Sequence, residues 1–536
     1  MKRIFSIAIM VALSALVARA QTLTMGGEVI SPANMSHLEA AKFAQTEHSF
    51  MTARVAAMGG AFTSLGADLS SMSINPAGMG MYRTSQLSMS MLYNNTRSTN
   101  GVVGYDQHKG SVSFNQIGTA LNLYQGTGAL VSFTIGFGYN KLANLNYRND
   151  ANWNNSEVTI GEFFAEQMYG IDPSELGSSK APFSNPNIYP DQWGGVLAYR
   201  TWFIDPVMDK EERFTGNYEV SGVPLENRVD ANLYMESEGS VGEYDFSMGF
   251  NFGNILYLGT TLGIQSIEQV VYYDYIEQYR GAQGNELQHM TFRPMVANYG
   301  SGVNFKIGAI LRPISAVRIG IAYHTPTAVS LTRDYRTTME TNFMDGDGFE
   351  DSSYVNTYDY DYNSPSKLLV GASVTLANRA IISVDWDRVW YDGMSMDTNG
   401  LEQAFAKDVK ADLGVANNFR VGVEVVPIQN LYLRGGYAYY GSPLNSDAEK
   451  YNDEGGAFFG TYKTHSDNFS LGVGWRFASG SSLDLAWTLS RAHFTNSVMY
   501  DYYYADSAQE ILVSGPTLSN TTHSTNTIGA TYSVLF

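Results

Sequence analysis

The eight histidines are the first residues to test for catalytic or metal chemistry. Such sites need imidazoles at set spacings from one another, or a nucleophile in a turn such as Gly-x-Ser-x-Gly. No two of these histidines share a metal-ligand spacing, and no Gly-x-Ser-x-Gly sequence accompanies them. We therefore expect no enzyme, no cofactor and no metal site, although a lipase-like or protease-like site built from several strands would leave no local motif. The histidines are His37, His48, His108, His289, His324, His465, His493 and His523.

An acidic stretch from Met344 to Asp351 is a second candidate for chemistry, as a cation loop. It lacks the twelve-residue series of oxygen ligands ending in Glu that a calcium loop requires. The surrounding segment 335–365 holds seven Asp or Glu residues against one basic residue. We interpret it as a solvated acidic loop that can contact the divalent ions of a lipopolysaccharide surface.

The segment 22–85 combines glycine pairs with an Asn-Pro turn. Gly59 and Gly60 permit backbone turns and close approach to neighbouring chain. Pro76 fixes its own φ and keeps Asn75 out of a helix, while Asn75 can accept a hydrogen bond from nearby backbone in an Asx-turn. This predicts a rigid bend. The bend can serve to hold the segment in place, to gate a channel, or both. Seven methionines in the segment suit either a pocket for varied apolar ligands or packing: Met25, Met35, Met51, Met58, Met72, Met79 and Met81.

Strict alternation of apolar and small or polar residues recurs along the rest of the chain and predicts strands. In 317–324, for example, Val317, Ile319 and Ile321 alternate with Arg318 and Gly320. Fourteen such strands are expected. Their ranges are 86–94, 110–123, 129–147, 242–252, 255–277, 291–311, 316–334, 366–376, 380–390, 419–426, 431–441, 467–477, 482–495 and 524–536.

The connections between these strands alternate between long and short. Short turns on one side with long loops on the other are typical of outer-membrane barrels, and a soluble sandwich has no reason to sort its loops in this way. Gly (52), Tyr (36) and Phe (27) are abundant and only 16% of residues are charged, which fits many strands with aromatic girdles. The short turns are 124–128, 253–254, 312–315, 377–379, 427–430 and 478–481, and the long connections include 148–241, 335–365, 391–418, 442–466 and 496–523.

The N-terminus predicts export. Residues 1–20 have a basic start, a short apolar run and Ala18-Arg19-Ala20, a cleavage pattern typical of a signal peptide. The chain has no cysteine, so a disulfide framework is excluded, and no later apolar run is long enough for a transmembrane helix. The formal charge of −19 argues against nucleic acid as a partner. We expect a signal peptide (1–20), an extension and plug (21–85), and a barrel (86–536).

The run Ala53-Arg54-Val55-Ala56-Ala57-Met58-Gly59-Gly60-Ala61-Phe62-Thr63, then Asp68, then Ser73-Ile74-Asn75-Pro76-Ala77-Gly78-Met79, resembles the plug signature of the FadL-type family of outer-membrane long-chain fatty-acid and hydrocarbon channels. The resemblance covers about 27 residues. It implies an all-β, 14-stranded antiparallel transmembrane barrel with an N-terminal plug in the lumen. It also implies passive uptake of hydrophobic small molecules with plug-gated, lateral release at a kinked third strand.

The resemblance implies two sets of site residues. The gating and substrate-binding set in the plug is Met58, Gly59, Gly60, Phe62, Asn75, Pro76 and Ala77. In the third strand, interior glycines commonly mark bulges or kinks, and the predicted exit residues are Gly136, Gly138 and Asn140.

Two alternatives stay open at this point. One is a general or substrate-selective porin for polar solutes, which the polar inner faces of the strands would suit. The other is a surface receptor for a hydrophobic ligand or haem. In every case we expect a bacterial outer-membrane protein, a monomer in contact with membrane lipid and lipopolysaccharide. Its terminal Phe536 resembles the recognition signal of the barrel assembly machinery.

Overall fold

A computed structural model gives the fold. It describes residues 35–99, 106–177, 182–221, 228–377, 379–397, 402–445, 463–494, 497–498, 501–506, 509–514, 517–518 and 522–536. The predicted signal peptide and the first part of the predicted extension therefore lie outside the described residues. Among the described residues, no helix is both long and apolar enough to cross a membrane.

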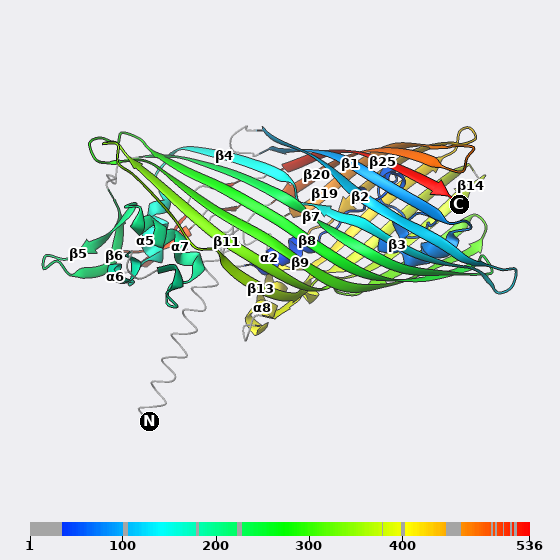
Figure 1. The fold of residues 1–536 in the computed structure, drawn as a ribbon, viewed down its shortest axis with the longest axis horizontal. Helices are drawn as coiled ribbons and strands as arrows, with labels where there is room; N and C mark the ends of the chain where they lie inside the picture. Colours follow the sequence, from blue (N-terminus) through cyan, green and yellow to red (C-terminus); the bar gives the residue numbers. More distant parts are fainter. Residues whose placement is uncertain are drawn as a thin grey trace, which may run out of the picture.

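The long strands form one closed antiparallel barrel of fourteen strand positions (Figure 1). The ring closes where β25 pairs with β1, from Gln86 opposite Leu535 to Thr99 opposite Thr522. In ring order the positions are β1 (Gln86–Thr99), β2 (Asp106–Gln125), β3 (Leu130–Asn144) with β4 (Tyr147–Ser156), β7 (Val229–Phe252), β8 (Leu256–Tyr279), β9 (Leu287–Ile314), β10 (Val317–His324) with β11 (Ala328–Phe343), β13 (Asn356–Asn363) with β14 (Ser366–Leu376), β15 (Ala380–Trp390), β17 (Val415–Val425), β18 (Leu431–Tyr440), β19 (Lys463–Arg476), β20 (Ser482–Phe494) and β25 (Thr522–Leu535).

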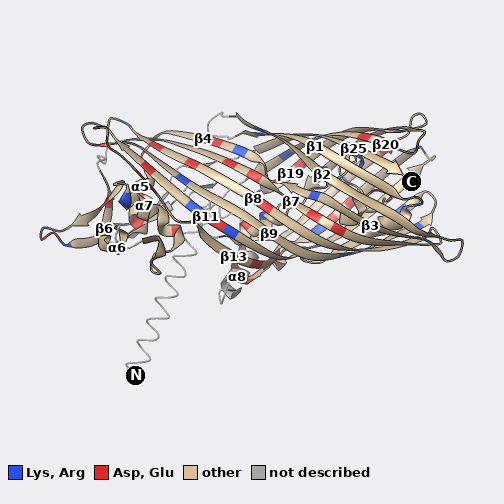
Figure 2. Cartoon of the chain, in the orientation of Figure 1, with Lys and Arg blue, Asp and Glu red and all other residues tan. Residues whose placement is uncertain are grey.

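Alternation within each strand separates an apolar outer face from a polar inner face. In β10, Ile319 and Ile321 are 48% and 49% exposed, whereas Ala322 and His324, on the opposite face, are buried. An apolar outer belt is stable in contact with lipid and not with water. A closed barrel can lie in lipid because its ring of strands satisfies every backbone hydrogen-bonding group without water. The chain is therefore an outer-membrane barrel, as the sequence predicts. Figure 2 shows that charged residues nevertheless lie along β7, β8 and β9.

The short connections fall where the sequence predicts them. β7 and β8 are separated by three residues, and Gly253 and Asn254 there adopt positive φ of 59° and 57°. Glycine and asparagine are the residues that tolerate this left-handed conformation in a tight turn. All the strand ends joined by short turns lie at one end of the barrel, and the long connections lie at the other end.

Several strands are longer than a bilayer requires. β7 and β8 have 24 residues and β9 has 28, against the 9–11 that a tilted strand needs to cross. Beyond them lies a small folded insertion at the barrel end opposite the C-terminus (Figure 1). Its elements are α5 (Ile160–Gln167), α6 (Pro173–Leu176), η5 (Pro182–Ser184), η6 (Pro190–Gln192), α7 (Trp193–Arg200), β5 (Ile204–Met208) and β6 (Phe214–Val220).

The remaining elements are short. Inside the barrel lie α2 (His37–Ala44), η2 (His48–Phe50), α3 (Ala53–Ala57), α4 (Ser71–Ile74) and η3 (Pro76–Met81). The connections carry β12 (Gly348–Ser352), η7 (Tyr391–Gly393), β16 (Ser395–Asp397), α8 (Glu402–Asp412), β21 (Ser497–Val498), β22 (Asp501–Asp506), β23 (Gln509–Ser514) and β24 (Thr517–Leu518).

Three sequence predictions about the strands need correction. The connection 148–241 is not all loop, because β4 reaches Ser156 and β7 already begins at Val229. The third strand is not continuous over 129–147, because it breaks at residues 145–146 between β3 and β4. The segment 335–365 is not a loop: β11 extends through it to Phe343, and β12 and β13 pair back onto β11. Outside the lipid the outward face of a strand can be polar, so the apolar outer face that marks the membrane part is absent there, although the inward residues Tyr335 and Met339 are buried.

Candidate functional site: a plugged lumen with a break in its wall

Residues 35–82, which we call the plug, fill the lumen. Its helix α3 contacts β18, β19, β20 and β25, whereas η3 contacts β3, β7, β8 and β9 on the other side of the ring. A segment that touches strands all round the barrel lies inside it, and the plug is drawn in blue behind β3 in Figure 1. The lumen is therefore closed by folded chain and is not an open pore.

Glycines in the wall let the plug backbone approach the strands closely. A Cβ added at Gly259 of β8 would lie 2.2 Å from the Pro76 carbonyl carbon, and one at Gly422 of β17 would lie 2.4 Å from the Met58 oxygen. Real Cβ atoms do not come this close to backbone, so either site excludes any side chain. The plug is seated by main-chain contact with small residues of the wall.

Asn75, Pro76 and Ala77 form the bend that seats η3. The Asn75 side-chain oxygen accepts a hydrogen bond from the Ala77 amide at 3.1 Å, which confirms the predicted Asx-turn, and its Nδ2 donates to the Thr63 carbonyl at 2.7 Å. All three residues are buried, and Ala77 packs on Tyr257 and Ile310 of the wall. These contacts give the bend a seating role.

The other four predicted plug residues are also packed against the wall and plug. Gly59 and Gly60 have φ of 62° and 73°, which favours glycine, and Gly60 packs against the His48 side chain. Met58 and Phe62 are fully buried. None of the seven predicted plug residues lines either of the two cavities described below.

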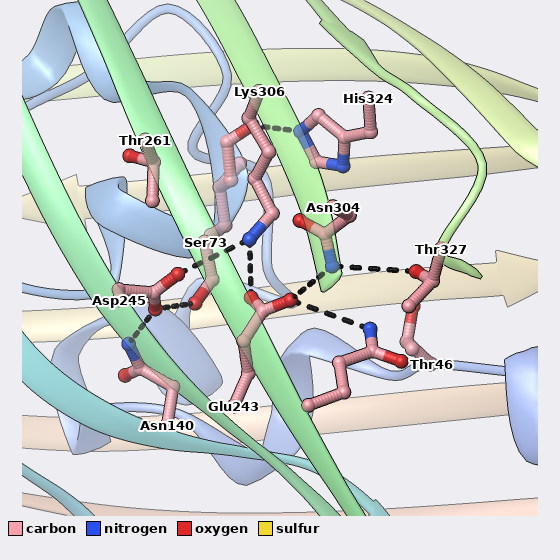
Figure 3. Close-up of polar contacts among 12 residues, drawn as sticks. Thr46, Ser73, Asn140, Glu243, Asp245, Thr261, Asn304, Lys306, His324 and Thr327 are labelled. Carbon is pink, nitrogen blue, oxygen red and sulfur yellow. Dashed lines mark hydrogen bonds and ion pairs between the residues drawn. The ribbon is translucent and has the colours of Figure 1, made fainter. Parts of the chain in front are cut away.

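A buried ionic cluster ties the plug to β7 and β9 (Figure 3). Lys306 of β9 forms ion pairs with Glu243 and Asp245 of β7, and all three side chains are at most 4% exposed. Ser73 of the plug donates to Asp245 at 2.5 Å, and Asn140 of β3 donates to the same carboxylate at 2.9 Å. Buried charges of this kind are stable only when each is paired, so the cluster fixes the plug against the part of the wall that holds β3, β7 and β9.

A second ionic group holds the opposite side of the plug. Arg54 of the plug and Arg434 of β18 both donate to Glu424 of β17, and Arg434 also pairs with Asp484. A plug thus bound by charge on two sides resists displacement unless both groups rearrange.

The predicted exit glycines have a packing role. Cβ atoms added at Gly136 and Gly138 would lie 2.5–2.8 Å from the side chains of Met72 and Met79 of the plug. β3 pairs regularly with β2 and β7 at both glycines, and its register shifts toward β7 lie elsewhere, at 130–132 and 141–143. The thioethers fill the space that the missing side chains leave, so no bulge forms at these positions.

Asn140, the third predicted exit residue, lies where the barrel wall changes. It is the last residue of β3 that pairs with β2, opposite Gln116. Beyond this point β2 residues 106–114 pair with β1 only, and β4 pairs with β7 only. Within the described residues, the wall between β2 and the strand segment 141–147 therefore lacks backbone hydrogen bonds, and we call this stretch the seam.

Polar side chains bridge the seam. Lys141 donates to Ser113 at 3.2 Å, and Gln107 donates to Asp150 of β4 at 3.1 Å. Lys109 reaches across the strand break to the Ser237 carbonyl of β7 at 3.2 Å. Side-chain bridges can exchange without breaking a backbone ladder, so the seam is held by contacts of another kind than the hydrogen-bonded wall on either side of it.

A cavity of about 120 Å³ lies between the outer part of the plug and the seam. Lys42 of α2 donates to the Tyr147 hydroxyl at 3.0 Å and thereby connects the plug to the broken strand. The lining mixes apolar and aromatic side chains with polar ones such as Glu47, Asn144 and Ser490. Its members include Lys42, Phe50, Ala143, Leu145, Tyr147, Ala492, Phe494 and His523.

A smaller, polar cavity of about 60 Å³ adjoins the ionic cluster. Lys306, Glu243, His324 and Lys367 contribute to its lining. Its size and charge suit water better than an apolar molecule, because a buried charge needs polar partners.

The burial of His48 predicts that the plug is sensitive to acid. Burial, followed by the positive charge of Arg420, lowers the pKa of His48 well below its ordinary value of 6.5. The seated plug therefore holds His48 neutral, whereas a released plug exposes a histidine that is protonated below about pH 6.5. Seating is fully stable above that pH and weakens as the pH falls below it.

We expect the population of released plug to rise about tenfold per pH unit below 6.5, because one pKa unit equals about 1.4 kcal/mol. Proteolytic cleavage of the plug at pH 5.0 and pH 7.5 measures this. His48→Gln should flatten the dependence, and His108→Gln, which alters an exposed histidine of β2, should not. Equal cleavage at both pH values in the unmodified chain would contradict the expectation.

Comparisons with known proteins were made with both sequence and fold. No family model matches the sequence, and no curated protein matches it. The toluene transporter TodX of Pseudomonas putida aligns over 90% of this chain and 98% of its own, with 12% identity and a TM-score of 0.48. A FadL homologue of Pseudomonas aeruginosa aligns over 91% and 98%, with 12% identity and a TM-score of 0.48. The toluene transporter TbuX of Ralstonia pickettii aligns over 91% and 99%, with 14% identity and a TM-score of 0.45.

Proposed function

We propose that this chain is a FadL-type channel for passive uptake of hydrophobic small molecules across the outer membrane. The cargo enters from the long-loop side, occupies the 120 Å³ cavity, and leaves sideways through the seam into the lipid. One observation carries the proposal: the strand residues Ala143–Tyr147 line the cavity and also form one edge of the seam. A molecule in the cavity is thus separated from lipid by a wall without backbone hydrogen bonds.

The size and lining of the cavity support a hydrophobic cargo. An engineered apolar cavity of about 150 Å³ accepts a benzene ring, so 120 Å³ suits a small aromatic ring or part of an alkyl chain. Phe50, Leu145 and Phe494 supply apolar contact, and Lys42 and His523 are among the polar lining residues. Long-chain fatty acids and monoaromatic hydrocarbons are both included in the proposal.

In this proposal the plug closes the channel as long as its predicted gating residues stay packed against the wall. These residues are Met58, Gly59, Gly60, Phe62, Asn75, Pro76 and Ala77. Asn140 marks the start of the exit. Gly136 and Gly138 act through their contacts with Met72 and Met79. The closed lumen supports this mechanism over a polar porin, which requires an open aqueous path.

The chain boundaries and partners belong to the same proposal. The mature protein begins near Gln21, residues 21–85 form the extension and plug, and 86–536 form the barrel. The proposal also includes insertion by the barrel assembly machinery and a monomeric state. It further includes contact of the acidic extracellular residues with lipopolysaccharide.

Filling the cavity tests the proposal. Ala492 lines the cavity from β20, and Ala492→Phe places a ring in the space that the cargo needs. We expect uptake of radiolabelled toluene and oleate by cells that lack other hydrophobic channels to fall at least tenfold. Ala492→Ser, which changes polarity but little volume, is the matched control and should retain most uptake. Full uptake by a folded, membrane-inserted Ala492→Phe protein would argue against this cavity as the route.

A further inference from the structure

Three ligand-type side chains meet on the outer face of the barrel, away from the plug and the cavity. His465 and Asp467 of β19 and His493 of β20 each offer one ligand atom, and these atoms lie within 4.8 Å of one another. His465 and His493 are direct cross-strand partners, and Asp467 is two residues along β19 on the same face. Alternation therefore places all three on one side of a two-strand platform.

The cluster lies just beyond the lipid-facing belt. The same outward face of β19 continues with Phe469 and Leu471, which are 49% and 59% exposed and belong to the apolar belt. His465, Asp467 and His493 are half-buried. They sit toward the long-loop end of the strands, so an ion from the external medium can reach them without crossing lipid.

A bulge in β19 orients His465. The register shifts at Thr464, between Lys463 and His465, and bulges commonly re-aim a neighbouring side chain. The Thr464 hydroxyl donates to the His493 carbonyl oxygen at 3.1 Å. Its one hydrogen is used in that bond, so the 3.1 Å contact between Thr464 Oγ1 and His465 Nδ1 requires the ring nitrogen to be the donor. A proton on Nδ1 leaves the Nε2 lone pair of His465 available to a metal.

The other two side chains also have supporting partners. Thr522 Oγ1 lies 3.4 Å from His493 Nδ1, and the Tyr437 hydroxyl donates to Asp467 Oδ1. The His465 and His493 rings are nearly parallel, with centroids 4.5 Å apart, so at least one ring turns about its side-chain torsions for both to face one ion. Outer partners of this kind support ligand side chains in metal sites. They leave Asp467 Oδ2 for a ligand.

We propose that His465, Asp467 and His493 bind one divalent transition metal ion on the outer surface of the barrel. Two imidazoles and a carboxylate are the ligands that Zn²⁺, Ni²⁺ and Cu²⁺ favour, whereas Mg²⁺ and Ca²⁺ favour oxygen ligands. Three protein ligands leave at least one position for water, so the ion exchanges with the medium. Bound there, the ion joins β19 to β20 where both strands leave the membrane.

Titration of the purified, detergent-solubilised protein without a histidine tag tests the site. After removal of metals with EDTA, calorimetric titration with ZnCl₂ should show one ion per chain. His465→Ala or His493→Ala should each weaken binding at least tenfold, and Asp467→Asn should weaken it by a smaller factor. His108→Ala removes a histidine outside the cluster and should leave the affinity unchanged.

A spectroscopic measurement separates ligation from an indirect effect on folding. Bound Cu²⁺ should give an electron paramagnetic resonance spectrum with hyperfine structure from two nitrogens, reduced to at most one in His493→Ala. The apo forms of the variants should unfold at the same temperature as the apo parent. The proposal is overturned if Zn²⁺ at millimolar concentration does not bind, or if it binds the double variant His465→Ala/His493→Ala as tightly as the parent.

Discussion

Cross-linking β2 to β3 across the seam is expected to abolish uptake of hydrophobic cargo and to leave the barrel folded. The chain has no cysteine, so introduced thiols are the only ones present. Ser113 and Lys141 contact each other across the seam through a side-chain hydrogen bond of 3.2 Å. Ser113→Cys with Lys141→Cys, joined by a methanethiosulfonate cross-linker about as long as a lysine side chain, holds the two edges together. We expect at least a tenfold loss of toluene and oleate uptake, reversed by a reducing agent.

A second pair of thiols provides the control. Ile117 and Tyr139 are cross-strand partners in the part of β2 and β3 that is already hydrogen-bonded. Cross-linking Ile117→Cys to Tyr139→Cys adds a covalent bond where the wall is closed in any case, so uptake should not change. If cargo passes through the lumen to the periplasm, the seam cross-link also has no effect, and lateral release is wrong.

Replacing Lys306 by Met is expected to unseat the plug. The substitution leaves Glu243 and Asp245 buried, close together and without a cation. Removing one partner of a buried ion pair costs about 3–5 kcal/mol, and Asp245 is also the acceptor for Ser73 of the plug. The plug should therefore leave its seat in a much larger fraction of molecules. Steady ion conductance of single channels in planar bilayers measures this fraction.

A triple variant separates the effect of the unpaired charges from the effect of the changed side-chain shape. Glu243→Gln and Asp245→Asn, added to Lys306→Met, remove the stranded charges and keep side chains of similar size. Conductance of the triple variant should return toward the closed level of the parent protein. Arg213→Met is a surface control, because Arg213 is 70% exposed and exposed pairs contribute little. A closed Lys306→Met channel would show that the cluster does not hold the plug.

Much of the barrel could be predicted from the sequence because the membrane imposes a simple pattern. Each crossing must be apolar outside and small or polar inside, as in 317–324, and this pattern is visible without any knowledge of the partner strand. Outside the lipid the constraint disappears. Residues 335–365 form strands with a polar outward face, while Tyr335 and Met339 of β11 are buried against the insertion. The segment therefore lacks the apolar outer face that predicts a membrane strand, and its acidic residues favoured a loop.

The candidate site was predictable only in part. The glycines and the Asn-Pro bend indicate a packed plug. The backbone conformations that require these residue types depend on neighbouring residues in the sequence, so they can be predicted from it. The seam is not local: it depends on where the pairing of β2 with β3 stops, at Gln116 and Asn140. A bulge was predicted at Gly136 and Gly138 because glycines inside a strand often mark one. The sequence does not show that methionines of the plug occupy the space beside these glycines.

The cluster of His465, Asp467 and His493 also depends on strand pairing that is not visible as a local motif. His465 and His493 are far apart in sequence and share no metal-ligand spacing. Continuing the register of the tight β19–β20 turn places them opposite each other. Strand pairing, and not spacing along the chain, is therefore the signal that would have revealed this cluster.

Photolabelling with a diazirine-bearing alkyl probe tests the route of the cargo most directly. The probe is illuminated in membranes during uptake, and the labelled residues are mapped by mass spectrometry. We predict labels on the cavity residues Ala143–Tyr147 and on Val112 and Phe114, which flank the seam on the lipid side and are exposed there. Competition by unlabelled toluene should remove the cavity labels. Labels on the short-turn end of the lumen, with none in the cavity or at the seam, would contradict lateral release.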